Sequence, residues 1–467
     1  MSIDAYRQLI ASKAIQFQPR GLSKVPPLNS AMFSYQEACT AFALETGCAG
    51  LFLSTGLGKS LCSLDWGRVI VEHTNKPVLM LAPLAVSKQH EREAAKFGID
   101  AKAIREPEEI KGARVYITNY ERLAKFADLD CGAVVLDESG ILKSFTGSTS
   151  RALRKRFEMT PYRLAASATP APNDHMEIGQ QSEFLGVMRS PEMLSRWFIA
   201  DQSEMGRYRI KAAARRAFWD WVASWARCVT LPSDLGYDDA SHVLPELVET
   251  IHTVAVDMTI GAGADKYGQT MLFRAPDMSA TSVHREKRFT SKDRANKCAE
   301  IIAQKRDEPW IVWCETDYDA DAIMPLLPDA VEVRGNMKPE AKEEALVAFS
   351  EGQIRQIVTK PSIAGFGLNW QHCANMVHNG LSFSFEAYHQ AVRRCWRFGQ
   401  KRPVHSHIVI AETEAPILAT VLKKAERNDA MRDAMRLAMR RAHKGARVLD
   451  DYNPTTNVQL PDWLRAA

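Results

Sequence analysis

The run LFLSTGLGKSLCSL at residues 51–64 constrains this chain more than any other segment. Strongly apolar residues lead into Gly56, Gly58, Lys59 and Ser60, the layout of a strand, a phosphate-binding loop and a helix start. The glycines let backbone N–H groups approach an anionic phosphate, Lys59 supplies a charge for the β and γ phosphates, and Ser60 supplies a hydroxyl for Mg2+. The full pattern has a further glycine where Leu53 stands, so a chance glycine turn is the alternative. We predict a nucleotide site formed by Thr55, Gly56, Leu57, Gly58, Lys59 and Ser60.

An acidic pair supplies the second half of this site. Asp137 and Glu138 follow the apolar run CGAVV at 131–135, which puts them at the carboxyl end of a buried strand. There an acidic pair can hold Mg2+ and orient the attacking water. A lone Asp-Glu pair after a strand is usually a helix N-cap, but this pair lies about 80 residues beyond Lys59, with room for two strand and helix units between. We therefore predict that Asp137 is a Mg2+ ligand together with Ser60.

The composition is typical of an ordinary soluble chain, and the length allows two or three domains. The chain has 467 residues, 46% hydrophobic and 25% charged, and a formal net charge of only +4. Nucleic-acid binding must therefore rest on local patches rather than on the total charge. The nine cysteines include no C-x-x-C pair, which favours reduced thiols in a cytoplasmic protein. Neither an apolar signal core at the N-terminus nor a run of about 18 apolar residues occurs, so we expect neither export nor a membrane span.

Strand-like runs fall into two series that alternate with helical patterns. The first series lies at 49–55, 77–83, 114–119, 133–138 and 162–170. The second lies at 247–257, 308–315, 330–335, 354–361, 374–380 and 404–411. This alternation predicts α/β domains with parallel sheets covered by helices. We expect domains at 1–174 and 246–414, a helical extension at 175–245 and a basic helical tail at 415–467.

Several short motifs occur in the order found in superfamily 2 helicases and translocases, over roughly residues 30 to 410. The matching segments are SYQEA (34–38), TGLGKS (55–60), LAPLAVSKQHEREAAKF (81–97), ITNYERL (117–123), DESGILKS (137–144), SATPAPND (167–174), GFGLNW (365–370) and QAVRRCWRFGQ (390–400). The chain most resembles the Swi/Snf-like branch, and its W-R-F-G-Q ending is similar to that of compact phage-encoded DEAD/DEAH-type helicases. The resemblance implies two tandem RecA-like P-loop domains that use ATP and Mg2+ in the cytosol of a prokaryote or a phage-infected host.

The same resemblance assigns further residues to the nucleotide. Gln36 is the adenine-reading glutamine, with Tyr35 or Phe33 available to stack on the base, although Tyr-Gln is ordinarily just a helix start. Gly365 and Gly367 resemble a loop that lets the backbone approach a phosphate, and an ordinary turn is the alternative.

Two arginines resemble the fingers that such enzymes direct at the γ-phosphoryl group. Gln390, predicted to contact the nucleotide, lies with Arg394 and Arg397 at i, i+4 and i+7, a spacing that predicts one shared helical face. If the second domain closes on the first, Arg394 and Arg397 would neutralise charge on the transferring group. A solvated basic face is the alternative.

For nucleic acid, the resemblance implies contacts to the phosphates of one DNA strand. Residues 432, 436 and 440 of the tail form a basic stripe that would either lie along a groove or coat a solvated face. The family usually carries alanine and histidine where this chain has Ser139 and Gly140, so Gly140 offers no side chain to bridge to 167–174. The candidate contacts are Ser87, Lys88, Thr118, Asn119, Lys143 and Lys360.

The expected function is that of a monomeric ATP-dependent motor on double-stranded DNA. Its phosphate contacts would be independent of sequence and steeply dependent on salt. One alternative is a strand-separating, fork-remodelling or annealing helicase, which needs a wedge that splits base pairs. The other is a slow nucleotide-dependent module that acts with a nuclease or methyltransferase partner.

Overall fold

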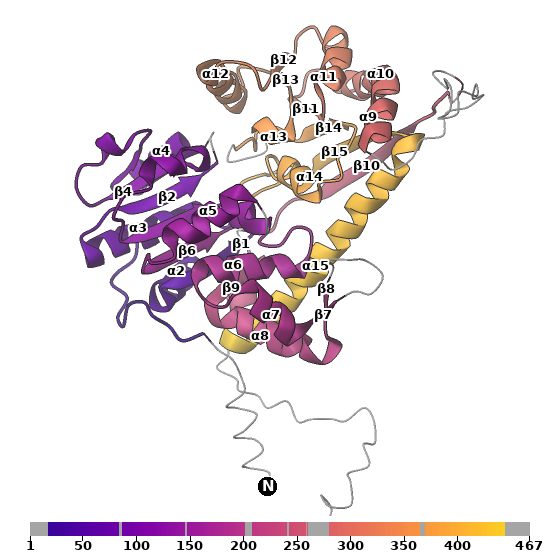
Figure 1. Ribbon diagram of the computed structural model, residues 1–467. Helices are drawn as coiled ribbons and strands as arrows, with labels where there is room; N and C mark the ends of the chain where they lie inside the picture. The colour runs from indigo at the N-terminus through magenta and orange to yellow at the C-terminus, as the bar shows by residue number, and fades with distance from the viewer. Residues whose placement is uncertain are drawn as a thin grey trace, which may run out of the picture.

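Two large parallel sheets with flanking helices dominate the computed structural model (Figure 1). The structure describes residues 17–83, 86–144, 147–200, 208–240, 242–257, 259, 280–364 and 369–443. We call the seven-stranded sheet with its helices the first unit, and the six-stranded sheet with its helices the second unit. The α/β class expected from the sequence is confirmed, and the two sheets are consistent with tandem RecA-like domains.

The first sheet has the strand order β3-β4-β2-β5-β6-β1-β9, and every pair of neighbours is parallel. Parallel pairing brings the carboxyl ends of its strands to a common edge, where the segments after β1 and β5 meet. Its strands are β1 Cys48–Leu53, β2 Val78–Ala82, β3 Ala101–Ala103, β4 Val115–Asn119, β5 Ala133–Asp137, β6 Tyr162–Ala166 and β9 Ala226–Val229. Its helices are α2 Ser34–Thr46, α3 Lys59–Thr74, α4 Ser87–Lys96, α5 Ser148–Phe157, α6 Ile178–Leu185, α7 Ser190–Trp197 and α8 Arg215–Trp225.

The segment expected as a helical extension also contributes strands. Its last strand, β9, joins the edge of the first sheet beside β1, and Ser54 donates its N–H to Val229 O at 2.9 Å just beyond that pairing. β7 (Phe198–Ala200) and β8 (Tyr208–Ile210) form a separate antiparallel pair. Trp221 and Trp225 of α8 are fully buried in the core of the first unit. This part of the segment therefore completes the first unit.

The second sheet has the order β10-β15-β14-β11-β13-β12, again with parallel neighbours. Arg294 is buried between Asp319 and Glu414 and ties the helices on one face together. The strands are β10 Leu247–Val254, β11 Trp310–Cys314, β12 Val331–Val333, β13 Gln356–Thr359, β14 Asn375–Asn379 and β15 Val404–Ala411. The helices are α9 Ala280–Phe289, α10 Ser291–Ala303, α11 Asp317–Ile323, α12 Pro339–Ser350, α13 Pro361–Ala364 and α14 Phe385–Val392.

The tail forms one long helix, α15 (Ala415–His443), that starts beside the second unit and ends on the first (Figure 1, yellow). Its methionines 431, 435 and 439 are buried in the core of the first unit. Arg436 pairs with Asp234 (Nε to Oδ1, 2.6 Å), and Arg441 pairs with Asp220 (Nη2 to Oδ1, 2.5 Å). Of the predicted stripe, Arg432 contacts Ser54 and both Arg436 and Arg440 lie beside Asp234, while the Arg440 side chain stays partly exposed. The stripe therefore packs at least partly against the first unit. Among the helices that the structure describes, none is long and apolar enough to cross a membrane.

Candidate functional site

The phosphate loop connects β1, which ends at Leu53, to α3, which begins at Lys59. Gly56 and Gly58 have φ angles of 93° and 76°, a backbone region that favours glycine. A Cβ on Gly58 would stand 2.0 Å from Gln36 Nε2, and a Cβ on Gly56 would stand 2.8 Å from the backbone nitrogen of Phe398. The loop is therefore held closely by α2 on one side and by the second unit on the other.

Lys59 contacts the predicted acidic pair directly. Its Nζ lies 2.7 Å from Glu138 Oε1 and 3.7 Å from Asp137 Oδ1. Burial alone would lower the pKa of Lys59, but the charges of Glu138 and Asp137 raise it above its ordinary value. Burial alone would raise the pKa of Asp137, but the charges of Lys59 and His90 lower it to about 2. The site therefore holds a charged lysine against two carboxylates.

His90 of α4 is a further member of the site that the sequence did not single out. Its Nε2 lies 2.9 Å from Asp137 Oδ2, and its side chain is almost fully buried. Burial would lower the pKa of His90, yet the adjacent Asp137 charge raises it, so this imidazole is poised to donate to the carboxylate. The only available sequence signal was its place in the segment 81–97, because its contact with Asp137 spans 47 residues.

The backbone of the acidic pair accepts a side-chain hydrogen bond at one residue and has an unusual conformation at the other. Tyr120 donates its hydroxyl to the carbonyl oxygen of Asp137 at 2.6 Å. Glu138 has φ 56° and ψ 55°, a left-handed conformation that is costly for a residue with a side chain. This conformation accompanies the short contact between Glu138 and Lys59.

The residues predicted to hold Mg2+ suit that ion. Asp137 Oδ1 is buried and accepts no hydrogen bond from any residue that the structure describes. Ser60 is the second residue of α3 and follows directly on Lys59. A carboxylate oxygen with spare acceptor capacity and a hydroxyl are both oxygen ligands of the kind that Mg2+ prefers.

The two arginines lie close to the first unit, although the predicted shared helical face is wrong. α14 ends at Val392, so Arg394 and Arg397 lie in the turns that follow it, and Arg394 Nε donates to Gln390 O at 3.2 Å. Burial and the Arg397 charge lower the pKa of Arg394 to about 9, while the Glu138 and Asp137 carboxylates oppose that change. Burial lowers the pKa of Arg397, which the Glu93 charge opposes. Arg394 is thus close enough to the acidic pair for the two carboxylates to influence its pKa, and Arg397 is close enough to Glu93 of α4 for that carboxylate to do so.

Gln36 braces the phosphate loop in this structure. Its Nε2 donates to Leu57 O at 3.0 Å and to the Tyr35 hydroxyl at 3.2 Å, and its Oε1 accepts from Phe33 N at 2.9 Å. To read an adenine edge, the amide would have to exchange some of these partners. The predicted loop at Gly365 and Gly367 lies outside the described residues.

Aromatic rings from three parts of the chain meet beside the phosphate loop. His242 Nε2 lies 3.0 Å from the Tyr35 hydroxyl, and its ring centroid lies 4.9 Å from that of Phe398. Phe33 lies 5.2 Å from His242 and 6.4 Å from Phe398, measured between ring centroids. Neither His242 nor Phe398 carried a sequence signal for this role beyond Phe398 lying in the segment 390–400. This ring cluster joins the two units at the loop.

The candidate nucleic-acid contacts divide into two kinds. The hydroxyls of Ser87 and Thr118 and Oδ1 of Asn119 are buried, and none has a hydrogen-bond partner among the residues that the structure describes. Lys88 lies 3.6 Å from Glu343 of α12, and Lys143 forms an ion pair with Glu386 of α14. Both lysines of the first unit thus contact carboxylates of the second unit.

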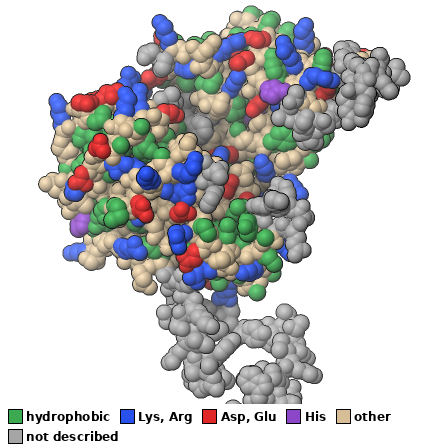
Figure 2. Space-filling view, viewed as in Figure 1, with side chains coloured by type: hydrophobic (Ala, Val, Ile, Leu, Met, Phe, Trp, Pro, Cys, Tyr) green, Lys and Arg blue, Asp and Glu red, His purple; other side chains and the backbone are tan. Residues whose placement is uncertain are grey.

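Lys360 borders a pocket of about 310 Å³ in the second unit. Its Nζ lies 2.9 Å from Asp317 Oδ1, and Arg334 lines the same pocket. Basic and acidic side chains are interspersed over the face seen in Figure 2, in keeping with the small net charge. The remaining residues that line the pocket are Gly335, Asn336, Ser362 and Ile363.

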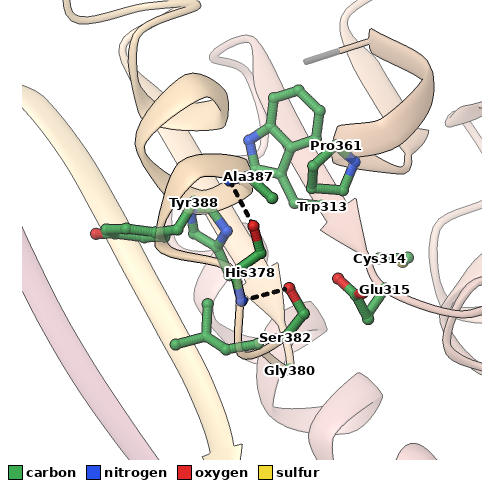
Figure 3. Close-up of a pocket in the computed structure, with 11 residues that line it drawn as sticks. Trp313, Cys314, Glu315, Pro361, His378, Gly380, Ser382, Ala387 and Tyr388 are labelled. Atoms are coloured by element: carbon green, nitrogen blue, oxygen red, sulfur yellow. Dashed lines mark hydrogen bonds between the residues drawn. The ribbon is translucent and has the colours of Figure 1, made fainter. Parts of the chain in front are cut away.

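A second, much smaller pocket lies among Trp313, His378 and Tyr388 in the second unit (Figure 3). Its volume of about 10 Å³ has room for about one water molecule. Burial lowers the pKa of His378 to about 3, so this imidazole is neutral at neutral pH. We assign the pocket to the packing of the second unit.

The two tandem parallel sheets with flanking helices are consistent with tandem RecA-like domains, and the candidate phosphate loop of the first faces an acidic pair. Residues 293–399 match the family model described as the helicase conserved C-terminal domain. This match supports a helicase of superfamily 1 or 2 and indicates a helicase-type, nucleic-acid-dependent ATPase. No curated protein matches the chain.

Proposed function

We propose that the chain is an ATP-dependent translocase that moves on double-stranded DNA, as a Swi/Snf-like member of the superfamily 2 helicases. The helicase match supports nucleic-acid-dependent ATP hydrolysis, and the motif order supports the choice of branch. The proposed site residues are those named from the sequence, with His90 added as the partner of Asp137.

One observation carries the proposal, namely that the second unit contacts the phosphate loop itself. Phe398 packs on Gly56, and Arg394 is close enough to the acidic pair for Glu138 and Asp137 to influence its pKa. The first unit carries the phosphate loop and the second unit carries the arginines, so neither unit alone has both. Hydrolysis therefore requires the two units to be together, and their closing and opening links chemistry to movement.

Each residue of the site would have its own role in phosphoryl transfer. Lys59 would bind the β and γ phosphates once these displace Glu138, and Glu138 would then orient the attacking water. Arg394 and Arg397 would neutralise charge that develops on the γ-phosphoryl group. Mg2+ held by Ser60 and Asp137 would neutralise phosphate charge when bound, and His90 would keep Asp137 in orientation.

For DNA, the proposed contacts lie on both units. The buried hydroxyls of Ser87 and Thr118 lack partners among the described residues, and each would donate to a phosphate oxygen once exposed. Asn119 would donate from its amide nitrogen, because its unpartnered Oδ1 can only accept. Lys360 and Arg334 line the larger pocket of the second unit, where Lys360 pairs with Asp317 and Arg334 pairs with Asp321 and Glu332, so a DNA phosphate would compete with these carboxylates. Contacts of this kind read the backbone of DNA and not its bases, as a motor that moves along any sequence requires.

The test is ATP hydrolysis by the purified chain, alone and with duplex DNA, single-stranded DNA or RNA, beside Lys59→Ala and Arg397→Ala variants. We expect duplex DNA to stimulate hydrolysis many-fold, and both variants to lose it. Stimulation by RNA alone would contradict the choice of DNA. Absence of stimulation by every nucleic acid would favour a nucleotide-dependent module that works with a partner protein.

Displacement assays separate translocation from strand separation. A motor that follows intact duplex should displace the third strand of a triplex while opening a forked duplex little. Efficient opening of the fork would instead identify a strand-separating enzyme.

A further inference from the structure

The tail helix α15 reaches the nucleotide site. Arg432, in its second half, donates a hydrogen bond from Nη2 to the hydroxyl of Ser54, the first residue after β1. Ser54 is almost fully buried, and its carbonyl oxygen accepts the N–H of Leu57 at 3.1 Å, which closes the turn that carries Gly56. Arg432 therefore contacts the base of the phosphate loop, 378 residues away in sequence.

Arg432 is fixed in place by its own helix. One turn further on, Arg436 pairs with the fully buried carboxylate of Asp234 at 2.6 Å. The other oxygen of that carboxylate accepts the N–H groups of Thr230 and Leu231 at 2.8 and 3.1 Å, directly after β9. Since β9 pairs with β1, the same anchor fixes α15 against the strand that leads into the phosphate loop.

Arg432 also borders the turn that carries the arginine fingers. Burial and the charge of Arg432 lower the pKa of Arg393 to about 9, and Arg432 is among the charges that lower the pKa of the buried His389. α15 packs against α14 at this point. One guanidinium from the tail thus lies between the phosphate loop of the first unit and the finger segment of the second.

The other end of α15 belongs to the second unit. Ile417 packs in a cluster with Leu381, Ile408 and Ile410, and Lys424 donates to Phe383 O at 2.9 Å. The helix has 29 residues, a length of roughly 43 Å at 1.5 Å per residue. It therefore links the second unit to the phosphate loop through one continuous helix.

We propose that Arg432 is a positioning residue of the nucleotide site, which holds the phosphate loop through Ser54 in the geometry that binds the triphosphate. This role rests on the proposed function. A loop fixed in advance loses less conformational freedom when the nucleotide binds, so Arg432 strengthens binding without touching the reacting atoms. Removing it should weaken nucleotide binding and raise KM for ATP, with a smaller effect on kcat.

The test is a double-mutant cycle that measures the Kd of a fluorescent ATP analogue, mant-ATP, with Mg2+. Arg432→Ala and Ser54→Ala should each weaken binding about tenfold, as expected for one lost hydrogen bond to a charged group. The double variant should bind no more weakly than either single variant, because both remove the same interaction. Arg432→Lys, which keeps the charge but not the planar fork, should recover part of the affinity.

Leu437→Ala is the matched control, because this side chain is exposed on the same helix and faces away from the site. It should bind mant-ATP as the unaltered chain does. Thermal unfolding should be similar for all four single variants. The inference is overturned if Arg432→Ala leaves Kd unchanged, or if the effects of the two alanine substitutions multiply in the double variant. If the unaltered chain itself binds no mant-ATP, the proposed function fails and this role fails with it.

Discussion

Lys143, which follows the acidic pair of the first unit, forms an ion pair with Glu386 at the start of α14 in the second unit. Glu386 also lies beside Gly140, where an added Cβ would stand 3.1 Å from its Oε1. A carboxylate of the second unit thus occupies the space that a side chain at position 140 would take. Glu386 also pairs with Lys143, which the sequence made a candidate contact for DNA.

Removing the charge of Glu386 should strengthen DNA binding. In Glu386→Gln, Lys143 loses its carboxylate partner and becomes available to a phosphate, so we expect about threefold tighter binding of duplex DNA at low salt. Fluorescence anisotropy of a labelled duplex measures this. Glu308→Gln, which alters an ion pair with Arg402, is the control. Equal changes in the two variants would show that net charge alone is responsible.

His90 should matter to catalysis through Asp137. His90→Ala removes the partner of Asp137 Oδ2, and loss of such an outer contact typically costs about 10- to 100-fold in activity or metal affinity. We therefore expect a lower kcat and a higher Mg2+ concentration at half-maximal ATP hydrolysis. His90→Asn, which retains a donor, should recover part of both. The exposed His73→Ala serves as control, and equal activity of His90→Ala and this control would contradict the role.

The second unit should lose stability in acid because of His378. Burial lowers the pKa of His378 from 6.5 to about 3, so between these values the unfolded chain binds a proton that the folded chain does not. The contribution of this group is complete above pH 6.5 and falls by about 1.4 kcal/mol per pH unit below it.

Urea unfolding of the unaltered chain and of His378→Leu tests this expectation. Between pH 6.5 and pH 5, the free energy of unfolding should fall less steeply in the variant, by the equivalent of one proton. At pH 8 the imidazole is neutral in both states, so any difference there reports packing alone. Parallel pH profiles would show that His378 does not carry the acid sensitivity.

Met435 should stabilise the first unit, although it belongs to the tail. Its side chain is fully buried with Trp221 and Trp225, so Met435→Ala should lower the free energy of unfolding by about 3 kcal/mol. Urea unfolding followed by tryptophan fluorescence measures the loss. Leu437→Ala, exposed two residues further on, should change it little. Similar losses in the two variants would mean that any alanine substitution in this part of α15 lowers the free energy of unfolding. The buried position of Met435 would then contribute nothing further.

Local sequence patterns predicted the regular part of the fold. Each run predicted as a strand contains a strand, because apolar runs between turn residues report burial directly. β9 was missed because its four residues continue a helical pattern, and its pairing with β1 decides its conformation. The helical face predicted for Arg394 and Arg397 failed for a related reason. Spacing gives the face only if the helix continues, and α14 ends at Val392.

The candidate site was predictable where neighbours in sequence act together. Gly56, Gly58 and Lys59 lie within four consecutive residues, where the two glycines adopt positive φ angles and the lysine contacts Glu138. His90 and Arg432 were not predictable, because each acts through a partner far away in the chain. Nothing local distinguishes a histidine that will meet a carboxylate from one on a surface.

The position of α15 has a consequence for how the chain is made. Met431, Met435 and Met439 fill the core of a unit whose sheet is complete by Val229. During synthesis the sheet of the first unit emerges from the ribosome roughly 200 residues before the helix that covers it. Its apolar surface therefore remains uncovered while the second unit is translated. α15 therefore closes the first unit only after the second unit has been synthesised.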